Sequence, residues 1–255
     1  MYKIIKYISI DILRNKVIIA YTLTLLLISL SVFNLEDTVE KGLLSLLNVV
    51  LILVPLISLI FSTVYMYNST EFIELLVCQP IRRARIWQSF LSGLSVSMMM
   101  AFIVGIGIPV IIYAPGATGI TLILSGLALT LVFVSLSVLG AVIVRDKARG
   151  VGTAIMIWLV FAIVFDALVL FLLFQFSDYP LEPLMIGLGT LNPIDLCRIL
   201  FLLKMDVSAL MGYTGAVFRS WFDTVPGMFI SATALMLWAI IPAWISTRKF
   251  IRKDL

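Results

Sequence analysis

The stretch that decides the fold is GITLILSGLALTLVFVSLSVLGAVIV, Gly119–Val144, which contains no charged side chain. It exceeds the roughly 20 helical residues that cross about 30 Å of hydrocarbon. Its polar residues do not alternate with apolar ones at every second position, as they would in a strand of a membrane barrel. The stretch therefore predicts a transmembrane helix.

Five further apolar runs reach a similar length. They are Val17–Leu35, Leu43–Tyr67, Gln88–Tyr113, Val151–Phe174 and Val225–Ile245. The chain of 255 residues is 62% hydrophobic and 13% charged, whereas soluble chains have about 45–50% apolar and about 25% charged residues. We therefore expect an all-α polytopic membrane protein with six transmembrane helices, built as a single transmembrane domain over residues 1–255.

Basic residues are divided unevenly between the segments that connect these runs. Of 18 Lys and Arg residues, all but four fall in the N-terminus, the loops after the second and fourth runs, and the C-terminus. The four exceptions are Lys41, Arg198, Lys204 and Arg219. Because basic loops stay in the cytoplasm, we predict that both termini are cytoplasmic. This distribution accounts for the net charge of +4 without a nucleic-acid partner.

The N-terminal residues 1–16 predict a short amphipathic helix. Ile5, Ile8 and Ile12 fall on one helical face, and Lys and Arg residues surround the rest. Such a helix is typical of segments that lie in the membrane interface. A cytoplasmic extension of the first span remains the alternative.

The loop over residues 68–87 predicts a second short helix on the cytoplasmic side. Asn68 is placed to cap this helix together with Glu71, and Pro80 is placed to end it. An apolar strip along the helix would consist of Phe72, Leu75 and Leu76. The alternative is a basic re-entry segment whose arginines only follow the charge rule for membrane topology.

The outer loop over residues 175–224 contains a third short helix, predicted over residues 192–204. Asn192 is a favourable N-cap, Pro193 suits the first helical position, and Asp195 is placed to reach back to the cap. Asp195 and Arg198 have the spacing of an ion pair on one helical face. The segment is too short to cross a membrane, so we expect a helix of the outer leaflet; a helix with no role beyond packing is the alternative.

Asp166 is the one carboxylate that lies inside an apolar run. An ionisable residue within a membrane span is a candidate functional residue, because its burial is costly. The alternative is a structural role, in which Asp166 pairs with Arg198 or with a hydroxyl group on a neighbouring helix.

Sulfur and nitrogen ligands give no reason to expect a metal site. The chain has no His, and its two cysteines, Cys78 and Cys197, are predicted on opposite sides of the membrane, so that they neither share a metal nor form a disulfide. On a helix, the side chains of Met98–Met100 would point in directions about 100° apart, so their sulfur atoms would not converge on one ion. We therefore predict no metal or cofactor in this chain.

Motifs of enzymes are missing from the sequence. A phosphate-binding loop of the form G-x-x-x-x-G-K-[ST] does not occur, and neither does the nucleophile motif G-x-S-x-G. Any hydrolysis of ATP is therefore expected on another chain. An intramembrane enzyme and a passive membrane scaffold remain as functions of other classes.

The segment TEFIELLVCQPIRRARI, Thr70–Ile86, resembles the loop of type-2 ABC transporter permeases. That family's loop has an acidic residue, two leucines, a proline and an arginine in this order. The resemblance implies that this loop is a coupling helix, which docks on a separate cytoplasmic ATPase subunit that binds ATP and Mg²⁺. The residues implied in this contact are Glu71, Glu74, Leu75, Leu76, Pro80, Arg82 and Arg83.

The segment LNPIDLCRILFLLKMDVSALMGYTGAVF, Leu191–Phe218, resembles a narrower group, the NosY-type permeases of nitrous oxide reductase maturation transporters. This resemblance implies a homodimer in the bacterial cytoplasmic (inner) membrane, with a cytoplasmic ATPase and a periplasmic copper-handling protein as partners. It implies a role in assembling the copper centres of nitrous oxide reductase, by transport or by mechanical signalling. A type-2 ABC exporter permease for another substrate, or an intramembrane enzyme, is the alternative.

The same resemblance implies where the periplasmic partner would bind. We expect an exposed polar edge of the outer helix to contact it. The residues of this expected contact are Asn192, Asp195, Arg198 and Asp206.

Overall fold

The computed structural model describes residues 2–175, 182–205 and 225–252, and within these ranges every regular element is a helix. Six helical segments of the described chain are long and apolar enough to cross a membrane, which confirms the prediction of six apolar helices of that length. They are Lys16–Leu35, Val39–Asn68, Arg83–Tyr113, Ala117–Ile143, Lys147–Leu172 and Ser231–Ile251.

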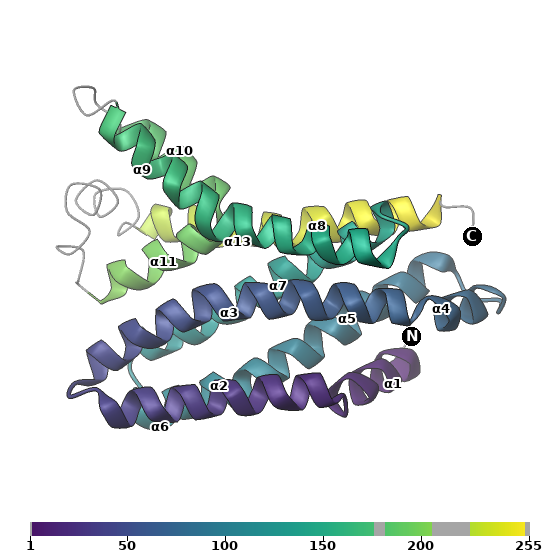
Figure 1. The fold of residues 1–255 in the computed structure, drawn as a ribbon, viewed down its shortest axis with the longest axis horizontal. Helices are drawn as coiled ribbons and strands as arrows, with labels where there is room; N and C mark the ends of the chain where they lie inside the picture. The colour runs from purple at the N-terminus through teal and green to yellow at the C-terminus, as the bar shows by residue number, and fades with distance from the viewer. Residues whose placement is uncertain (1, 176–181, 206–224, 253–255) are drawn as a thin grey trace.

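The first, second and fourth spans are the single helices α2 (Lys16–Leu35), α3 (Val39–Asn68) and α7 (Ala117–Ile143). The sixth span lies within α13 (Val225–Ile251). Figure 1 shows these long helices side by side, with both chain termini at one end of the molecule. We call this end the termini end and the other the far end.

The third and fifth spans each contain a short π-helix. The third runs through α5 (Arg83–Phe102), the π-helix η1 (Ile103–Gly107) and α6 (Ile108–Tyr113). The fifth runs through α8 (Lys147–Leu159), the π-helix η2 (Val160–Val164) and α9 (Phe165–Gln175). Helix propensity and hydropathy do not predict a π-helix, so neither interruption was expected.

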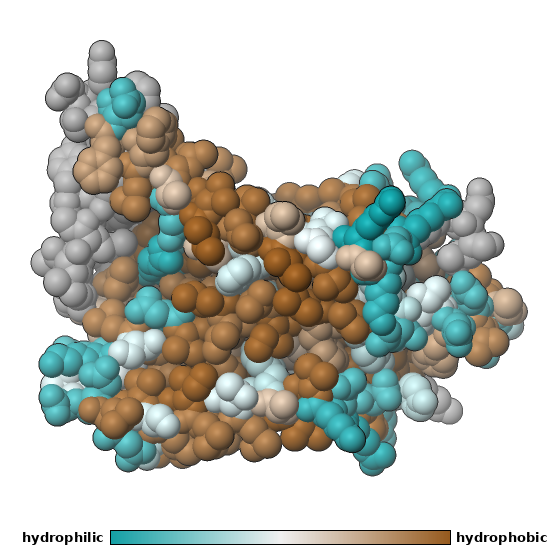
Figure 2. Space-filling view, in the orientation of Figure 1, coloured by the Kyte–Doolittle hydropathy of each residue, from teal (hydrophilic) through white to brown (hydrophobic). Residues whose placement is uncertain are grey.

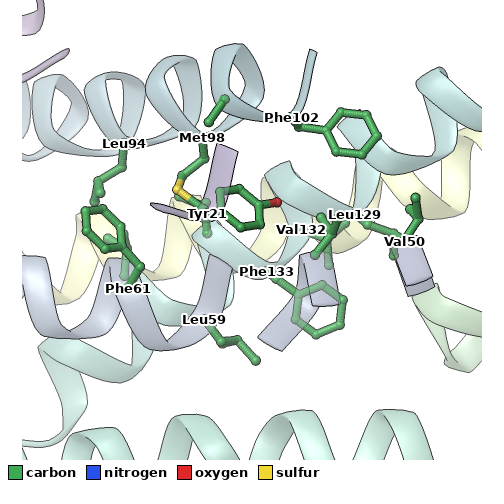
Figure 3. Packing of buried hydrophobic residues seen from close by; sticks show 14 of the residues in the cluster. Tyr21, Val50, Leu59, Phe61, Leu94, Met98, Phe102, Leu129, Val132 and Phe133 are labelled. Carbon is green, nitrogen blue, oxygen red and sulfur yellow. The ribbon is translucent and has the colours of Figure 1, made fainter. Parts of the chain in front are cut away.

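Helix α7 forms the centre of the bundle and packs against α3, α5 and α13. Its side chains are apolar around most of its circumference, which is typical of a helix surrounded by others. Leu129, Val132 and Phe133 are fully buried there, and Figure 3 shows them beside Val50 and Phe102 from other spans. In addition, the hydroxyl groups of Thr63 and Ser137 form a hydrogen bond of 2.9 Å that joins α3 to α7.

The outer surface carries the distribution expected of a membrane protein. Figure 2 shows a broad hydrophobic band across the helices and hydrophilic side chains gathered at the two ends. The fifth span contributes most strongly to the band, because none of the residues in its most apolar window is buried. Its outer part, α9, leans away from the other spans together with α10 (Glu182–Leu191) in Figure 1.

The amphipathic helix predicted over residues 1–16 is α1 (Tyr2–Leu13). The structure buries Ile8 and Ile12 completely, in a contact between α1 and α5. Ile8 lies directly over Gly93 of α5, where a Cβ atom would approach its side chain to less than ordinary contact distance. The isoleucine face therefore packs against protein. The exposed face of α1, which carries Lys6 and Tyr7, is the face available for the predicted contact with the membrane interface.

Membrane topology gives a first testable prediction. In a variant whose exposed Cys78 is replaced by Ser, a cysteine introduced at Thr118 should react with an impermeant thiol reagent in intact cells. A cysteine at Lys147, the first residue of α8 at the termini end, should react only after the membrane is opened, because basic segments stay inside. Labelling of the Lys147 position in intact cells would contradict a cytoplasmic termini end.

Candidate functional site

The loop expected to form a coupling helix contains α4 (Thr70–Val77), which lies at the termini end (Figure 1). Ser69 occupies the N-cap position without a side-chain hydrogen bond, and the hydroxyl of Thr70 donates to the Tyr67 carbonyl at 2.8 Å. The prediction that Asn68 caps this helix is wrong. Asn68 ends α3, and its side-chain oxygen accepts a hydrogen bond from Lys147 Nζ at 2.7 Å.

The structure does not gather Phe72, Leu75 and Leu76 into the single apolar strip that the sequence predicts for α4. Ile73 and Leu76 are the buried residues of the helix. Leu75 is 67% exposed and Phe72 lies at the rim, in ring contact with Tyr7. The expected strip is therefore divided, because Ile73 takes the inward position and Leu75 turns outward.

The outward face of α4 carries acidic side chains beside the exposed leucine. Glu71, Glu74 and Leu75 are exposed, and so is Cys78 one turn further on. These residues recur at helical spacing, so they form one surface on a helix that its other face fixes to the bundle. Such a surface is suited to contact with another protein.

The residues after α4 connect it to the third span. The helix ends at Val77, three residues before Pro80, which lies exposed in the turn. Arg82 is exposed at the N-cap position of α5, and Arg83 is its half-buried first residue. A pocket of about 210 Å³ lies behind α4, and Glu74, Trp87 and Arg145 are among its lining residues.

At the far end, the outer helix begins and ends as predicted, because α11 covers Pro193–Lys204. Asn192 is its N-cap, and its side-chain oxygen accepts a hydrogen bond from the Ile194 backbone at 3.0 Å. The Asn192 amide also donates to Asp195 Oδ2 at 2.9 Å, which is the reach back to the cap that the sequence predicts.

Arg198 joins α11 to the fifth span. Its Nη1 atom lies 2.9 Å from Asp195 Oδ1 and 3.0 Å from Asp166 Oδ2. These distances confirm the predicted Asp195–Arg198 pair. They also show Asp166 in the structural role that was its alternative, as a partner of Arg198. The Asn192 amide donates a further hydrogen bond of 2.9 Å to the Phe161 carbonyl within η2.

The burial of Asn192, Asp195 and Arg198 contradicts the prediction that they form an exposed polar edge. Asn192 is fully buried, and the side chains of Asp195 and Arg198 are only 14% and 33% exposed. They are directed toward one another and toward η2, because polar groups in this apolar setting need partners. The expectation of an exposed edge is therefore wrong for them, and Asp206 lies outside the described residues.

Burial raises the pKa of the Asp195 carboxyl to about 7, and the Arg198 guanidinium opposes this shift. The Asp166 carboxylate nearby raises the pKa further. A raised pKa with a charged partner marks the network around Arg198 as a candidate functional site.

The sulfur atoms are dispersed. Cys78 follows α4 and Cys197 lies in α11, at opposite ends of Figure 1. Burial raises the pKa of the Cys197 thiol, whose sulfur lies 3.7 Å from the Ser125 carbonyl oxygen. Met98 is fully buried whereas Met100 is half exposed, as expected of side chains that diverge along a helix. The described residues contain no group of three His, Cys, Asp or Glu side chains that could hold a metal ion.

Sequence reasoning missed the contacts that link the elements around α11. Helix α10 and the π-helix η2 were not expected, and Trp238 of α13 donates from its indole to the Thr190 carbonyl at 3.3 Å. Phe161 of η2 packs edge-on against Trp238 and Phe133. The sequence contained one signal for these contacts, the pair Asn192–Pro193. A strong N-cap inside an apolar region indicates that a helix must begin at a fixed place in the fold.

A scan against protein-family models and a search of curated proteins found no match to this chain.

Proposed function

We propose that this chain is the membrane-spanning permease subunit of an ABC transporter that resembles the NosY-type permeases. In this proposal it works as a homodimer in a bacterial inner membrane. A separate cytoplasmic ATPase hydrolyses ATP, and a periplasmic copper-handling protein binds outside. The complex supports assembly of the copper centres of nitrous oxide reductase.

The observation that carries the proposal is the geometry of α4. It is a short helix whose Ile73 and Leu76 are buried and whose Glu74 and Leu75 face outward, at the end where both termini and most basic residues lie. If that end is cytoplasmic, as the charge distribution predicts, α4 presents a rigid surface to a cytoplasmic partner. A loop without this division of faces would offer the ATPase nothing fixed to act on.

Force applied to α4 has a continuous route through the bundle. Helix α4 packs against α3 and α5, both of which pack against α7, and α7 packs against α11 at the far end. Rigid packed helices are the elements that carry coupling between distant sites. This continuous packing is compatible with mechanical signalling as well as with transport.

The test is complementation of a deletion strain. Without this protein, nitrous oxide reductase should be made and exported but should lack part of its copper, measured as metal content of the purified enzyme. The double variant Glu74→Ala with Leu75→Ala should fail to restore the copper and should copurify with less ATPase. Glu40→Ala, which removes an exposed acid at the far end, is the matched control and should restore it fully.

Two outcomes would contradict the proposal at different points. Fully metallated reductase in the deletion strain would remove the NosY-type role, leaving the generic exporter permease as the function to test. Full restoration by the double variant, with normal recovery of the ATPase, would instead remove α4 from the coupling.

A further inference from the structure

The network around Arg198 has more negative charge than positive. A single guanidinium nitrogen, Nη1, serves carboxylate oxygens from two elements, Asp195 of α11 at 2.9 Å and Asp166 of α9 at 3.0 Å. With both acids ionised, the three side chains carry a net charge of −1. Their side chains are 14% to 33% exposed, so water compensates this charge only in part.

The helices packed against α11 offer little further positive charge. Helix α7 has no ionisable residue, and those of α3 lie in its first and last turns. The basic residues of α13 lie in its last turn at the termini end, and α10 has only Glu182, its first residue. Within α11 itself, Lys204 is exposed about 13 Å along the axis from Asp195. Within the part of the chain that the structure describes, one proton is therefore the simplest way to balance the three side chains.

The same network holds the fifth span at its bend. Asn192 donates to the Phe161 carbonyl in η2, and Arg198 binds Asp166, the second residue of α9. Beyond Asp166, α9 leans away from the other spans and exposes Leu170, Phe171 and Phe174. A π-helix leaves the helical hydrogen-bond ladder irregular, and helices kink at such sites.

We propose that Asp166, Asp195 and Arg198 form a proton-operated latch that fixes α9 to α11 while the Asp195 carboxyl group is protonated. When the proton is bound, one acid donates to the other and Arg198 balances the remaining charge. When it leaves, two carboxylates compete for one guanidinium nitrogen, and α9 is freed to move about η2. The latch requires neither an ATPase nor copper, so it goes beyond the proposed function.

The direction of the pH dependence follows from the raised pKa of Asp195, about 7 when latched. A released Asp195 would return toward the ordinary value of about 3.9. The latched state therefore binds the proton more tightly than the released state. Its extra stability is complete below about pH 4 and is lost as the pH rises through about 7.

Infrared titration of the purified full-length protein in lipid nanodiscs detects the proton directly. We expect the band of a protonated carboxyl group to disappear with a midpoint near pH 7. Asp195→Asn should abolish this transition, and its amide should still donate to Asp166. Asp166→Asn should lower the midpoint, because Asp195 then has Arg198 to itself. Asp37→Asn, at an exposed site at the far end, is the control and should leave the midpoint unchanged.

Distances between spin labels test the movement. With Cys78 replaced by Ser, labels at the exposed positions Phe174 and Lys204 report on α9 and α11. The wild-type background should give one narrow distribution at about pH 5 and a broader, longer one at about pH 8. Asp195→Asn should stay narrow at both values.

Three results would overturn the latch. These are a carboxyl transition that survives Asp195→Asn, a midpoint that Asp166→Asn leaves unchanged, and label distances in the wild-type background that do not respond to pH. The first would place the proton elsewhere, the second would show that Asp166 does not act on the proton of Asp195, and the third would show that the proton does not hold α9 to α11.

Discussion

Replacing Arg198 with Leu should destabilise the protein by about 2–3 kcal/mol. The change leaves the Asp166 and Asp195 carboxyl groups without their common cation in a mostly buried site. Removing one partner of a buried ion pair costs about 3–5 kcal/mol, and the one-third exposure of Arg198 reduces this through solvent screening. The measurement is the free energy of unfolding in detergent micelles.

Compensating variants separate this charge effect from a loss of packing. Arg198→Leu combined with Asp195→Asn should recover much of the stability, because only one acid then remains. Lys204→Leu removes an exposed cation from the same helix and should cost less than about 1 kcal/mol. Equal losses in the single and double variants would contradict a role for uncompensated charge.

The change Gly126→Ala should destabilise the bundle by about 1–3 kcal/mol, the usual range for overpacking a core. A Cβ atom at Gly126 of α7 would overlap the ring of Phe102 from α5. Phe102 is fully buried, and Figure 3 shows it beside Leu129 and Val132 of α7. Either the Phe102 ring or helix α7 would have to shift.

Gly140, in the same helix, provides the matched control. A Cβ atom there meets nothing within 4 Å, so Gly140→Ala should be neutral or stabilising by about 0.5–1 kcal/mol, since Ala favours helix over Gly. Phe102→Leu in the Gly126→Ala background should relieve part of the loss, which a double-mutant cycle would measure. A loss at Gly126 no larger than that at Gly140 would contradict the close contact.

The sequence predicts the spans well because each apolar run is long and the membrane sets the length of a helix. It also predicts α11, because Asn192 and Pro193 define a helix start by local chemistry. It fails at Asn68 and along α4, where a neighbouring lysine and the inward position of Ile73 decide the outcome. Those contacts join residues distant in sequence, and no local pattern encodes them.

The Arg198 network lies between these cases. The spacing of Asp195 and Arg198 predicts their pairing within one helix, and Asp166 was weighed as a partner because a buried acid needs one. The burial of Asn192 and its bond to Phe161 depend on the unexpected π-helix η2. The polar residue types therefore indicated that these side chains make contacts, but not whether the side chains face solvent or the protein interior.

The π-helix η2 also sets the angular position of everything that follows it in the fifth span. An α-helix turns by about 100° per residue, and a single π-turn inserts one residue without advancing the surrounding helix in the usual way. In a straight α-helix of the same sequence, Asp166 would lie on a different face from the one that meets Arg198. A related chain one residue shorter at η2 would form a continuous α-helix and keep its acid toward α11, whereas a chain of the same length without the π-turn would turn its acid away.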